Sequence, residues 1–409
     1  MDFKKFELEN GLRVVVHEDR STKVAVLNVL YDVGSRDEQS EKTGFAHLFE
    51  HLMFGGSKNI PAYDEPLQKV GGENNAWTST DLTNYYISIP SNNLETAFWL
   101  ESDRMLSLSF DSAVLEVQRK VVIEEFKQRY LNQPYGDAWL KLRPIAYQKH
   151  PYRWATIGKE LAHIENATME DVKSFFYKFY VPNNAILVVA GDVDFEEVKA
   201  LSEKWFGSIP KGSPLQRALP EEPAQMEKRT FMNEADVPVD ALYKVYHVGG
   251  RLASDHHATD LLSDVLGRGK SSRLNERLVK EKRLLSSVSC SLTGSIDPGL
   301  LVIQGRLNQG VSFEQVELEL DKIIHNIQAE VVSEKELEKV KNLSESSHLF
   351  GEMELLNKAF NLAYFTLLGD TNMINSEVKK IRSVKASDIR QTAMMLRPEN
   401  SSTLYYKAN

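Results

Sequence analysis

A short motif that is repeated in the two halves of the chain restricts its fold more than any other sequence feature. The stretch "VLYDVGSR" (Val29–Arg36) returns as "KVYHVGGR" (Lys244–Arg251), 215 residues further along. In each copy an alternating strand leads to a glycine, an arginine and then a helix with an acidic start. Between the copies, "GSIPKGSPLQRALPEEPAQ" (Gly207–Gln225) holds four prolines and little periodicity, which is typical of an interdomain linker. The pattern predicts two related α/β halves.

The domain boundaries follow from this repeat. We expect an N-terminal domain over residues 1–212, a linker over 213–228 and a C-terminal domain over 229–409. The length of 409 residues is too great for one ordinary domain and suits two or three. The predicted fold class is α+β, in which each half is a mixed, largely antiparallel sheet packed with helices.

Hydrophobic periodicity and turn residues locate the main elements. The expected strands are Leu12–Val16, Val24–Val33, a strand pair or one bent strand over Asn75–Ile89, and Asn183–Val193. The expected helices are Ser40–Met53 with Thr43 as its N-cap, Leu94–Met105, Ser112–Leu131 and Phe195–Phe206.

Charge and composition exclude some classes of partner. The net charge is −9 and the charges are interspersed, which argues against nucleic acid as a main partner. No run approaches the roughly 18 apolar residues of a membrane span. The N-terminal stretch "MDFKKFELENGLRVVV" reads as strand rather than as a secretion signal, and the single Cys290 fits a reducing compartment. A cytoplasmic protein without nucleic-acid or membrane partners is expected.

The stretch "GFAHLFEHLMFGGS" (Gly44–Ser57) places three polar side chains in an otherwise apolar helix. His47 and His51 share one face, about 6 Å apart along the axis, so both imidazoles can reach one metal ion. Glu50 lies on the edge of that face and could act as general base on a zinc-bound water. The repeat maps the three positions onto Leu262, Val265 and Leu266, so the polar trio is not needed for burial. The alternative is a pair of core histidines bonded to backbone.

A catalytic zinc ion needs a third protein ligand, and "SAVLEVQRKVVIEEFKQRYL" offers three glutamates. Glu125 falls near the middle of the apolar stripe of this helix, whereas Glu124 and Glu116 lie away from it. Glu125 is therefore the predicted third ligand, and a buried salt bridge with an arginine is the alternative. Gln118, one heptad earlier, is a candidate to hydrogen-bond to the metal-binding side chains. The predicted stripe consists of Val114, Leu115, Val121, Val122 and Phe126.

With these residues in place, the chain resembles the inverzincins of the pitrilysin/insulinase family, to which the mitochondrial processing peptidase belongs. The resemblance runs over essentially the whole chain, including "GLRVVV", "VGSRDE", "VVIEEF" and "VVAGDV". It implies a zinc metalloendopeptidase with one zinc ion per chain, acting on short or unfolded peptides. It also implies two homologous halves that face each other across a cavity. "NAWT" would be an edge strand to which a peptide adds as an extra strand, which makes Asn75, Ala76, Trp77 and Thr78 the candidate substrate-binding residues.

Two departures from the family pattern bear on function. Relatives often carry a glutamate where this chain has Gln118. This difference bears on the metal affinity of the site and not on its ligand set. Relatives also hold substrate with an arginine and, seven residues later, a tyrosine in the second half; the aligned positions here are Val279 and Ser286. We therefore expect a dimer, formed either by two copies of this chain or with a homologous subunit that carries the arginine/tyrosine clamp. Arg273 or Arg283 serving the same purpose within one chain is the alternative.

Other candidates carry less weight. The pair His256–His257, with nearby aspartates, is better explained as the solvated start of a helix than as a second metal site. Two other functions remain open, which are a non-catalytic assembly subunit of the same family and an unrelated metal-dependent hydrolase. Members with a purely structural role tend to lose the metal motif, which is intact here.

Overall fold

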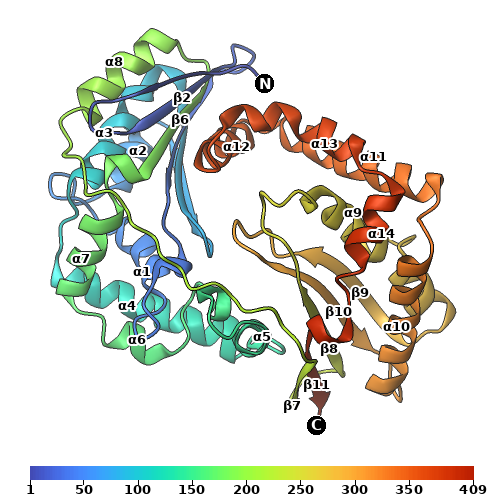
Figure 1. Cartoon of the computed structure of the whole chain (residues 1–409). Helices are drawn as coiled ribbons and strands as arrows, with labels where there is room; N and C mark the ends of the chain where they lie inside the picture. The colour runs from blue at the N-terminus through green and yellow to red at the C-terminus, as the bar shows by residue number, and fades with distance from the viewer. The chain divides into compact units, whose positions relative to one another are not determined.

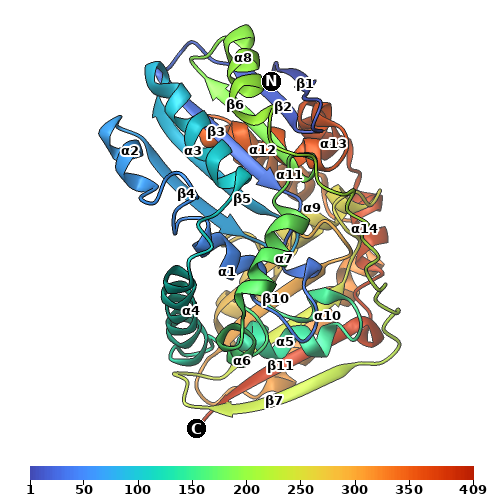
Figure 2. The same cartoon turned by 90° about the vertical axis from the view of Figure 1, so that its left-hand side faces the viewer.

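The computed structural model describes residues 1–409, and the chain divides into two units. Unit 1 comprises Met1–Lys127, Trp154–Leu219 and Leu349–Asn375, and unit 2 comprises Gln128–Arg153, Pro220–His348 and Ser376–Asn409 (Figures 1 and 2). Each unit contains one mixed sheet packed with helices, which confirms the predicted fold class. Each unit also combines segments from both sides of the predicted linker.

The sheet of unit 1 has six strands in the order β1-β2-β6-β3-β5-β4. All neighbours are antiparallel except β2 and β6, which run parallel. The central strands are the most apolar segments of the unit, and β6 ("AILVVAG") is buried along its whole length. β4 lies at one edge and pairs only with β5. The strands are β1 (Lys4–Glu7), β2 (Arg13–Glu18), β3 (Val24–Tyr31), β4 (Glu73–Thr78), β5 (Thr83–Pro90) and β6 (Ala185–Gly191).

Helices cover both faces of this sheet. The helices of the N-terminal half are α1 (Phe45–Leu52), α2 (Asp64–Lys69), α3 (Leu94–Leu106), α4 (Ser112–Phe126), α6 (Leu161–Glu165), α7 (Met169–Phe179) and α8 (Phe195–Phe206). The opposite face is covered by α12 (Leu355–Leu367), which comes from late in the chain (Figure 1). Its residues Ala359, Leu362 and Phe365 pack in one buried cluster with Val26 and Val188 of the sheet.

Unit 2 repeats this plan with a five-stranded sheet in the order β7-β11-β8-β10-β9. Only β7 and β11 are parallel. The strands are β7 (Arg229–Ala235), β8 (Ala241–His247), β9 (Leu285–Leu292), β10 (Leu300–Leu307) and β11 (Ser401–Ala408). The helices of the C-terminal half are α9 (His256–Gly267), α10 (Phe313–Ala329), α11 (Glu334–Gly351), α13 (Glu377–Ser383) and α14 (Ala386–Ala393). Leu262, Val265 and Leu266 of α9 are fully buried, as expected from the repeat.

One helix of each half of the chain packs on the sheet formed mainly by the other half. α5 (Ala138–Ala146) precedes the linker but packs on the sheet of unit 2, where Leu142 and Ala146 join a cluster with Tyr243 and Leu404. α12 follows the linker but packs on the sheet of unit 1. No sequence feature of these two helices indicated this exchange, because an apolar helix face does not specify which sheet it will cover.

The linker has no helix or strand between Phe206 and Arg229, yet it is held at two points. The guanidinium of Arg217 donates to the carboxylates of Asp32 and Asp37 in unit 1 at 2.7–3.2 Å. Within unit 2, the carboxylate of Glu222 accepts three backbone N–H groups from Gln148–His150 at 2.8–2.9 Å. Arg217 therefore anchors the linker to unit 1, and Glu222 anchors it within unit 2.

Most of the expected elements are present, with differences at their ends. The Asn75–Ile89 stretch is the β4–β5 pair, and α8 matches its predicted bounds. The predicted helix Ser112–Leu131 ends as an α-helix at Phe126 and continues as one π-helical turn over Lys127–Leu131. None of the helices combines the length and the apolarity required to cross a bilayer.

Candidate metal centre

Helix α1 carries both histidines, and its start is fixed by a side chain that the sequence did not reveal. The predicted N-cap Thr43 is wrong, because Gly44 occupies that position with φ of +85°. A Cβ at Gly44 would lie 2.6 Å from the carbonyl oxygen of Ile157, so only glycine fits there. The carboxylate of Glu38 accepts the backbone N–H groups of Gly44 at 2.9 Å and Ala46 at 2.8 Å. Glu38 thereby satisfies amides that a helix N-terminus leaves unpaired.

Thr43 instead holds the segment before α1 against its neighbours. Its hydroxyl lies 2.8 Å from Nδ1 of His163 and accepts the backbone N–H of Lys159 at 2.8 Å. At the other end of α1, the carboxylate of Asp103 accepts a hydrogen bond from the hydroxyl of Ser57 and another from the side-chain amide of Asn59. Hydrogen bonds to other segments of unit 1 therefore fix the start of the short helix and the loop that follows it.

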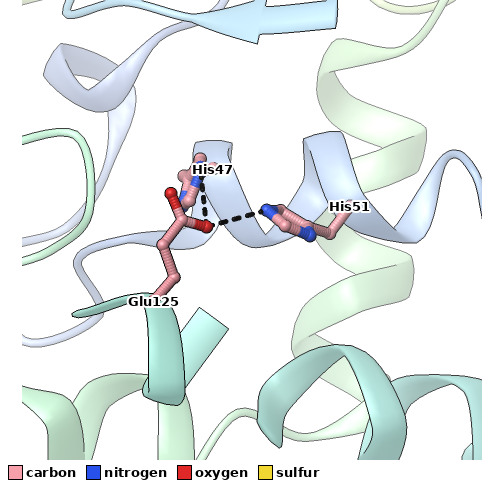
Figure 3. Close-up of side chains that lie close together, drawn as sticks. All are labelled: His47, His51 and Glu125. Carbon is pink, nitrogen blue, oxygen red and sulfur yellow. Dashed lines mark ion pairs between the residues drawn. The ribbon is translucent and has the colours of Figure 1, made fainter. Parts of the chain in front are cut away.

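His47 and His51 project from the same face of α1, as their spacing predicts (Figure 3). Their rings are edge-to-face with centroids 4.8 Å apart, and their side chains are 13% and 23% exposed. The other face is buried and consists of Phe45, Leu48, Phe49 and Leu52. The two imidazoles thus remain accessible at the surface of a helix that is otherwise anchored in the core.

Helix α4 brings Glu125 to the two imidazoles. Oε2 of Glu125 lies 3.7 Å from Nε2 of His47 and 3.4 Å from Nε2 of His51 (Figure 3). One ligand atom from each residue can be chosen so that all three lie within 4.8 Å of one another. Tetrahedral zinc with ligands at about 2.0–2.1 Å separates neighbouring ligand atoms by about 3.4 Å. The three side chains therefore fit a zinc ion in donor type and in spacing.

The other acidic residues of α4 point away from this cluster. Glu124 is exposed and pairs with Lys127 at 2.7 Å, and Glu116 pairs with Arg119 and Lys120. The predicted buried stripe was partly wrong, because Val121 is 44% exposed. The buried residues of α4 are Leu115, Val122 and Phe126. Gln118 is half-buried on the same helix, and its role at the metal site stays a prediction.

Glu50 is held by the edge strand of the sheet. The hydroxyl of Thr78 in β4 donates a hydrogen bond of 2.5 Å to Oε2 of Glu50. Of the other predicted substrate-binding residues, Asn75 is exposed, while Trp77 packs edge-to-face on Phe360 with centroids 5.0 Å apart. Asn75, Ala76, Trp77 and Thr78 all lie in β4, the edge strand that the resemblance implied.

A buried aromatic and ionic cluster supports α1 and the β5 strand beside it. Arg104 and Glu101 of α3 form a fully buried ion pair, and the guanidinium of Arg104 lies 4.5 Å from the ring centroid of Tyr85. The hydroxyls of Tyr85 and Tyr180 are 3.1 Å apart, and burial raises the pKa of both well above the ordinary tyrosine value. Sequence reasoning missed this pair, although Glu101 and Arg104 sit at helical spacing in an apolar helix. A buried charge pair at i and i+3 was the available signal.

In unit 2, the two residues aligned with the arginine and tyrosine of the substrate clamp are Val279 and Ser286. Val279 packs against the hydrophobic core of the unit, and the hydroxyl of the exposed Ser286 donates weakly to the carbonyl of Arg306 at 3.3 Å. The guanidinium of Arg273 is held by Glu336 through two hydrogen bonds of 2.9 and 2.7 Å. Arg283 has φ of +52° at the turn before β9.

The His256–His257 pair begins α9, but it is less solvated than expected. Both side chains are partly buried, and this burial lowers the pKa of His256 to about 3. His257 lies 3.8 Å from the carboxylate of Glu377. The one group of three or more residues with metal-binding geometry is His47, His51 and Glu125.

Comparisons with known proteins point to one family. The family model described as "Insulinase (Peptidase family M16)" matches residues 13–158, and that described as "Peptidase M16 inactive domain" matches residues 166–344. The zinc protease PqqE of Helicobacter pylori is 32% identical over 408 residues, covering 98% of this chain and 91% of that protein. YmxG of Bacillus subtilis, named an uncharacterised zinc protease, is 26% identical over 403 residues, covering 97% and 96%. The crystal structure of a protease from Helicobacter pylori matches with a TM-score of 0.92 and 31% identity, over 99% of each chain.

Proposed function

Because the chain belongs to the insulinase family of peptidases, peptidase family M16, we propose that it is a zinc-dependent endopeptidase for short or unfolded peptides. The observation that carries the proposal is the convergence of His47, His51 and Glu125, with Glu50 next to His51 in the same helix. Relatives named zinc proteases support the choice of metal. Two imidazoles and one carboxylate are also a ligand set of catalytic zinc sites.

The three ligands would hold one zinc ion per chain and leave a position open. A zinc ion bound there would lower the pKa of a water molecule and polarise the carbonyl of the scissile bond. In this scheme Glu50 accepts the proton of the attacking water at its carboxylate and later delivers it to the leaving amine. The start of α1 is fixed by Glu38 and its apolar face is buried, which holds His47 and His51 in their orientation.

The edge strand β4 supports the choice of an extended peptide as substrate. Its backbone pairs with β5 on one side only, so the other side can accept an added strand through backbone hydrogen bonds. Such recognition selects segments that can become extended, which short or unfolded peptides readily do. Asn75, Ala76 and Trp77 would contribute through their backbone.

The proposal is tested by removing and restoring the metal. The purified chain is treated with a chelator, and cleavage of a quenched fluorescent peptide is measured before and after addition of one equivalent of zinc. We expect activity to be lost with the metal and regained with zinc. Full activity of the metal-free chain, or no cleavage by the zinc-loaded chain at high concentration with any of several unfolded peptides, would contradict it.

We also infer that the chain works as a dimer, with a homologous subunit that carries the missing arginine and tyrosine. The observation that favours this arrangement is the pair Val279 and Ser286, neither of which offers a charged or phenolic donor. A chain that supplies the metal site alone would depend on its partner for substrate positioning. A non-catalytic assembly role is the second candidate, and the intact metal-binding cluster argues against it.

A further inference from the structure

Thr78 contacts the carboxylate proposed to act as the general base. Its Oγ1 donates a hydrogen bond to Oε2 of Glu50, with 2.5 Å between the two oxygens. A threonine hydroxyl has a single proton to donate. While that proton is shared with Glu50, the hydroxyl cannot also donate to a peptide. The resemblance implied that a peptide pairs with the backbone of this strand, and the hydrogen bond to Glu50 leaves that pairing open.

The strand holds the hydroxyl of Thr78 in a fixed place. Thr78 pairs with Thr83 in the β4–β5 register, which fixes its backbone. Successive side chains of a strand point to opposite faces, so Trp77 lies on the face away from Glu50. There the Trp77 ring packs on Phe360 of α12 and on Tyr86 of β5, with centroids 5.0 and 6.0 Å apart. The end of β4 is thus held on one face by the packing of Trp77 and on the other by the hydrogen bond from Thr78 to Glu50.

A glutamate side chain has several rotatable bonds and would otherwise sample several positions. A hydrogen bond from a hydroxyl to an ionised carboxylate is among the stronger hydrogen bonds in proteins and selects one of these positions. Thr78 belongs to β4, the edge strand to which a peptide would add. Its hydroxyl therefore links the Glu50 carboxylate to the strand that would bind the substrate. Proton transfer depends steeply on such geometry, because a misplacement of about 1 Å can cost about 100-fold in rate.

We propose that Thr78 is a positioning residue, whose hydroxyl fixes the Glu50 carboxylate relative to the substrate-binding edge of β4 and does not itself bind the peptide. This inference rests on the peptidase function proposed above. It predicts an effect on kcat with little effect on KM, which a substrate-binding side chain would not give.

The test compares Thr78→Val, which keeps the shape but lacks the hydroxyl, with Thr78→Ser, which keeps the hydroxyl. Thr80→Val is the matched control, because the hydroxyl of Thr80 contacts Asp81 at 3.3 Å instead of Glu50. We expect Thr78→Val to lower kcat about 10- to 100-fold with KM within about two-fold of the unmodified chain. Thr78→Ser should restore most of the rate, and Thr80→Val should leave it unchanged. Zinc content, measured by elemental analysis, should be the same in all four proteins.

A binding measurement separates positioning from recognition without relying on turnover. The affinity for an uncleaved peptide is measured with zinc-loaded Glu50→Gln and with the double variant that also carries Thr78→Val. Equal affinities support the proposal, and a loss of about ten-fold or more in the double variant would overturn it by making Thr78 a peptide-binding residue. Unchanged kcat in Thr78→Val would also overturn it. Absence of zinc-dependent cleavage by the unmodified chain would instead overturn the proposed function, and this role of Thr78 with it.

Discussion

Glu38 accepts a hydrogen bond of 2.8 Å from the backbone N–H of Ala46, the residue immediately before the first histidine of the candidate metal centre. The other oxygen of the same carboxylate accepts the N–H of Gly44 at 2.9 Å. Glu38 is 8% exposed, so water cannot readily replace it at these amides. The position of His47 therefore depends on a side chain nine residues earlier in the chain.

Replacement of Glu38 by alanine should destabilise unit 1 and weaken zinc retention. Two buried amides would lose their partner, at a cost of about 1–3 kcal/mol in the free energy of unfolding. Urea denaturation with zinc-content analysis measures both effects. Glu41→Ala is the control, because Glu41 is exposed three residues further along. Equal stability of the two variants would show that Glu38 does not cap α1.

Replacement of Glu50 by glutamine should preserve the fold and the bound zinc but remove nearly all peptidase activity. Glutamine can hydrogen-bond to Thr78 and to water, but it cannot accept the proton, and loss of a general base costs about 10²- to 10⁴-fold in rate. Peptide cleavage and metal content are compared with those of the unmodified chain. Activity within a few-fold of normal would remove Glu50 from the proposed mechanism.

The adjacent glutamates of α4 provide a matched pair for the metal site. Glu125 lies 3.4 Å from His51, whereas Glu124 is exposed and pairs with Lys127. Glu125→Ala should therefore lose far more zinc than Glu124→Ala, and both should fold, since neither side chain is part of the core. Elemental analysis after dialysis against a weak chelator measures the difference. Similar zinc loss in the two variants would refute Glu125 as a ligand.

Asp260 in unit 2 gives a prediction for the pH dependence of stability. Burial, with a smaller contribution from the charge of Asp264, raises the pKa of Asp260 to about 6 from 3.8. The folded state thus favours the protonated carboxyl, and the associated stabilisation is present below pH 3.8 and lost as the pH rises through about 6. Asp260→Asn should raise the free energy of unfolding by about 1–3 kcal/mol at pH 7 and change it little at pH 4.

Urea denaturation at the two pH values measures this difference. Asp255→Asn, at the start of the same helix, is the control. A stability gain from Asp260→Asn that is the same at pH 4 and pH 7 would mean that ionisation of Asp260 is not its cause.

The sequence revealed the site residues that lie within one helix, but it did not reveal the residues from distant segments that hold this helix in place. His47, Glu50 and His51 lie within one helix, so their shared face follows directly from the helical period. Glu125 was reached through the stripe of α4, even though Val121 in that stripe is exposed. Contacts between distant segments leave no such periodic trace. The sequence therefore did not show that Glu38 caps α1.

The same limit applies to the fold. The positions of the strands in the first half and the similarity of the two halves followed from alternating patterns and the repeat, whereas the order of the strands in each sheet was not predicted. α5 and α12 are amphipathic helices with no local mark of the sheet that they cover, so their exchange between the halves was not predictable. The bonds of Arg217 to Asp32 and Asp37 are likewise tertiary, although an arginine in a proline-rich linker was visible.

The residues at the two clamp positions, Val279 and Ser286, lead to a prediction about assembly. Val279 is partly buried against the core of unit 2, and Ser286 makes one weak hydrogen bond, to a backbone carbonyl. Arg273 of the same chain was the alternative for holding the substrate. Its guanidinium is already held by Glu336 through two hydrogen bonds, which argues against this role. A clamp of the expected kind would require charged and phenolic donors that these positions do not supply.

The isolated chain should therefore have weak peptidase activity even when it is fully loaded with zinc. The metal centre and β4 can bind a peptide backbone, but poor positioning can cost several kcal/mol of the activation barrier. Adding a homologous subunit with the arginine and tyrosine should raise kcat/KM at least ten-fold, and Glu50→Gln in this chain should abolish the gain. Introducing Val279→Arg and Ser286→Tyr together should recover part of it in the isolated chain. A kcat/KM of about 10⁴ to 10⁶ M⁻¹s⁻¹ for the isolated, unmodified chain would show that it needs no such partner.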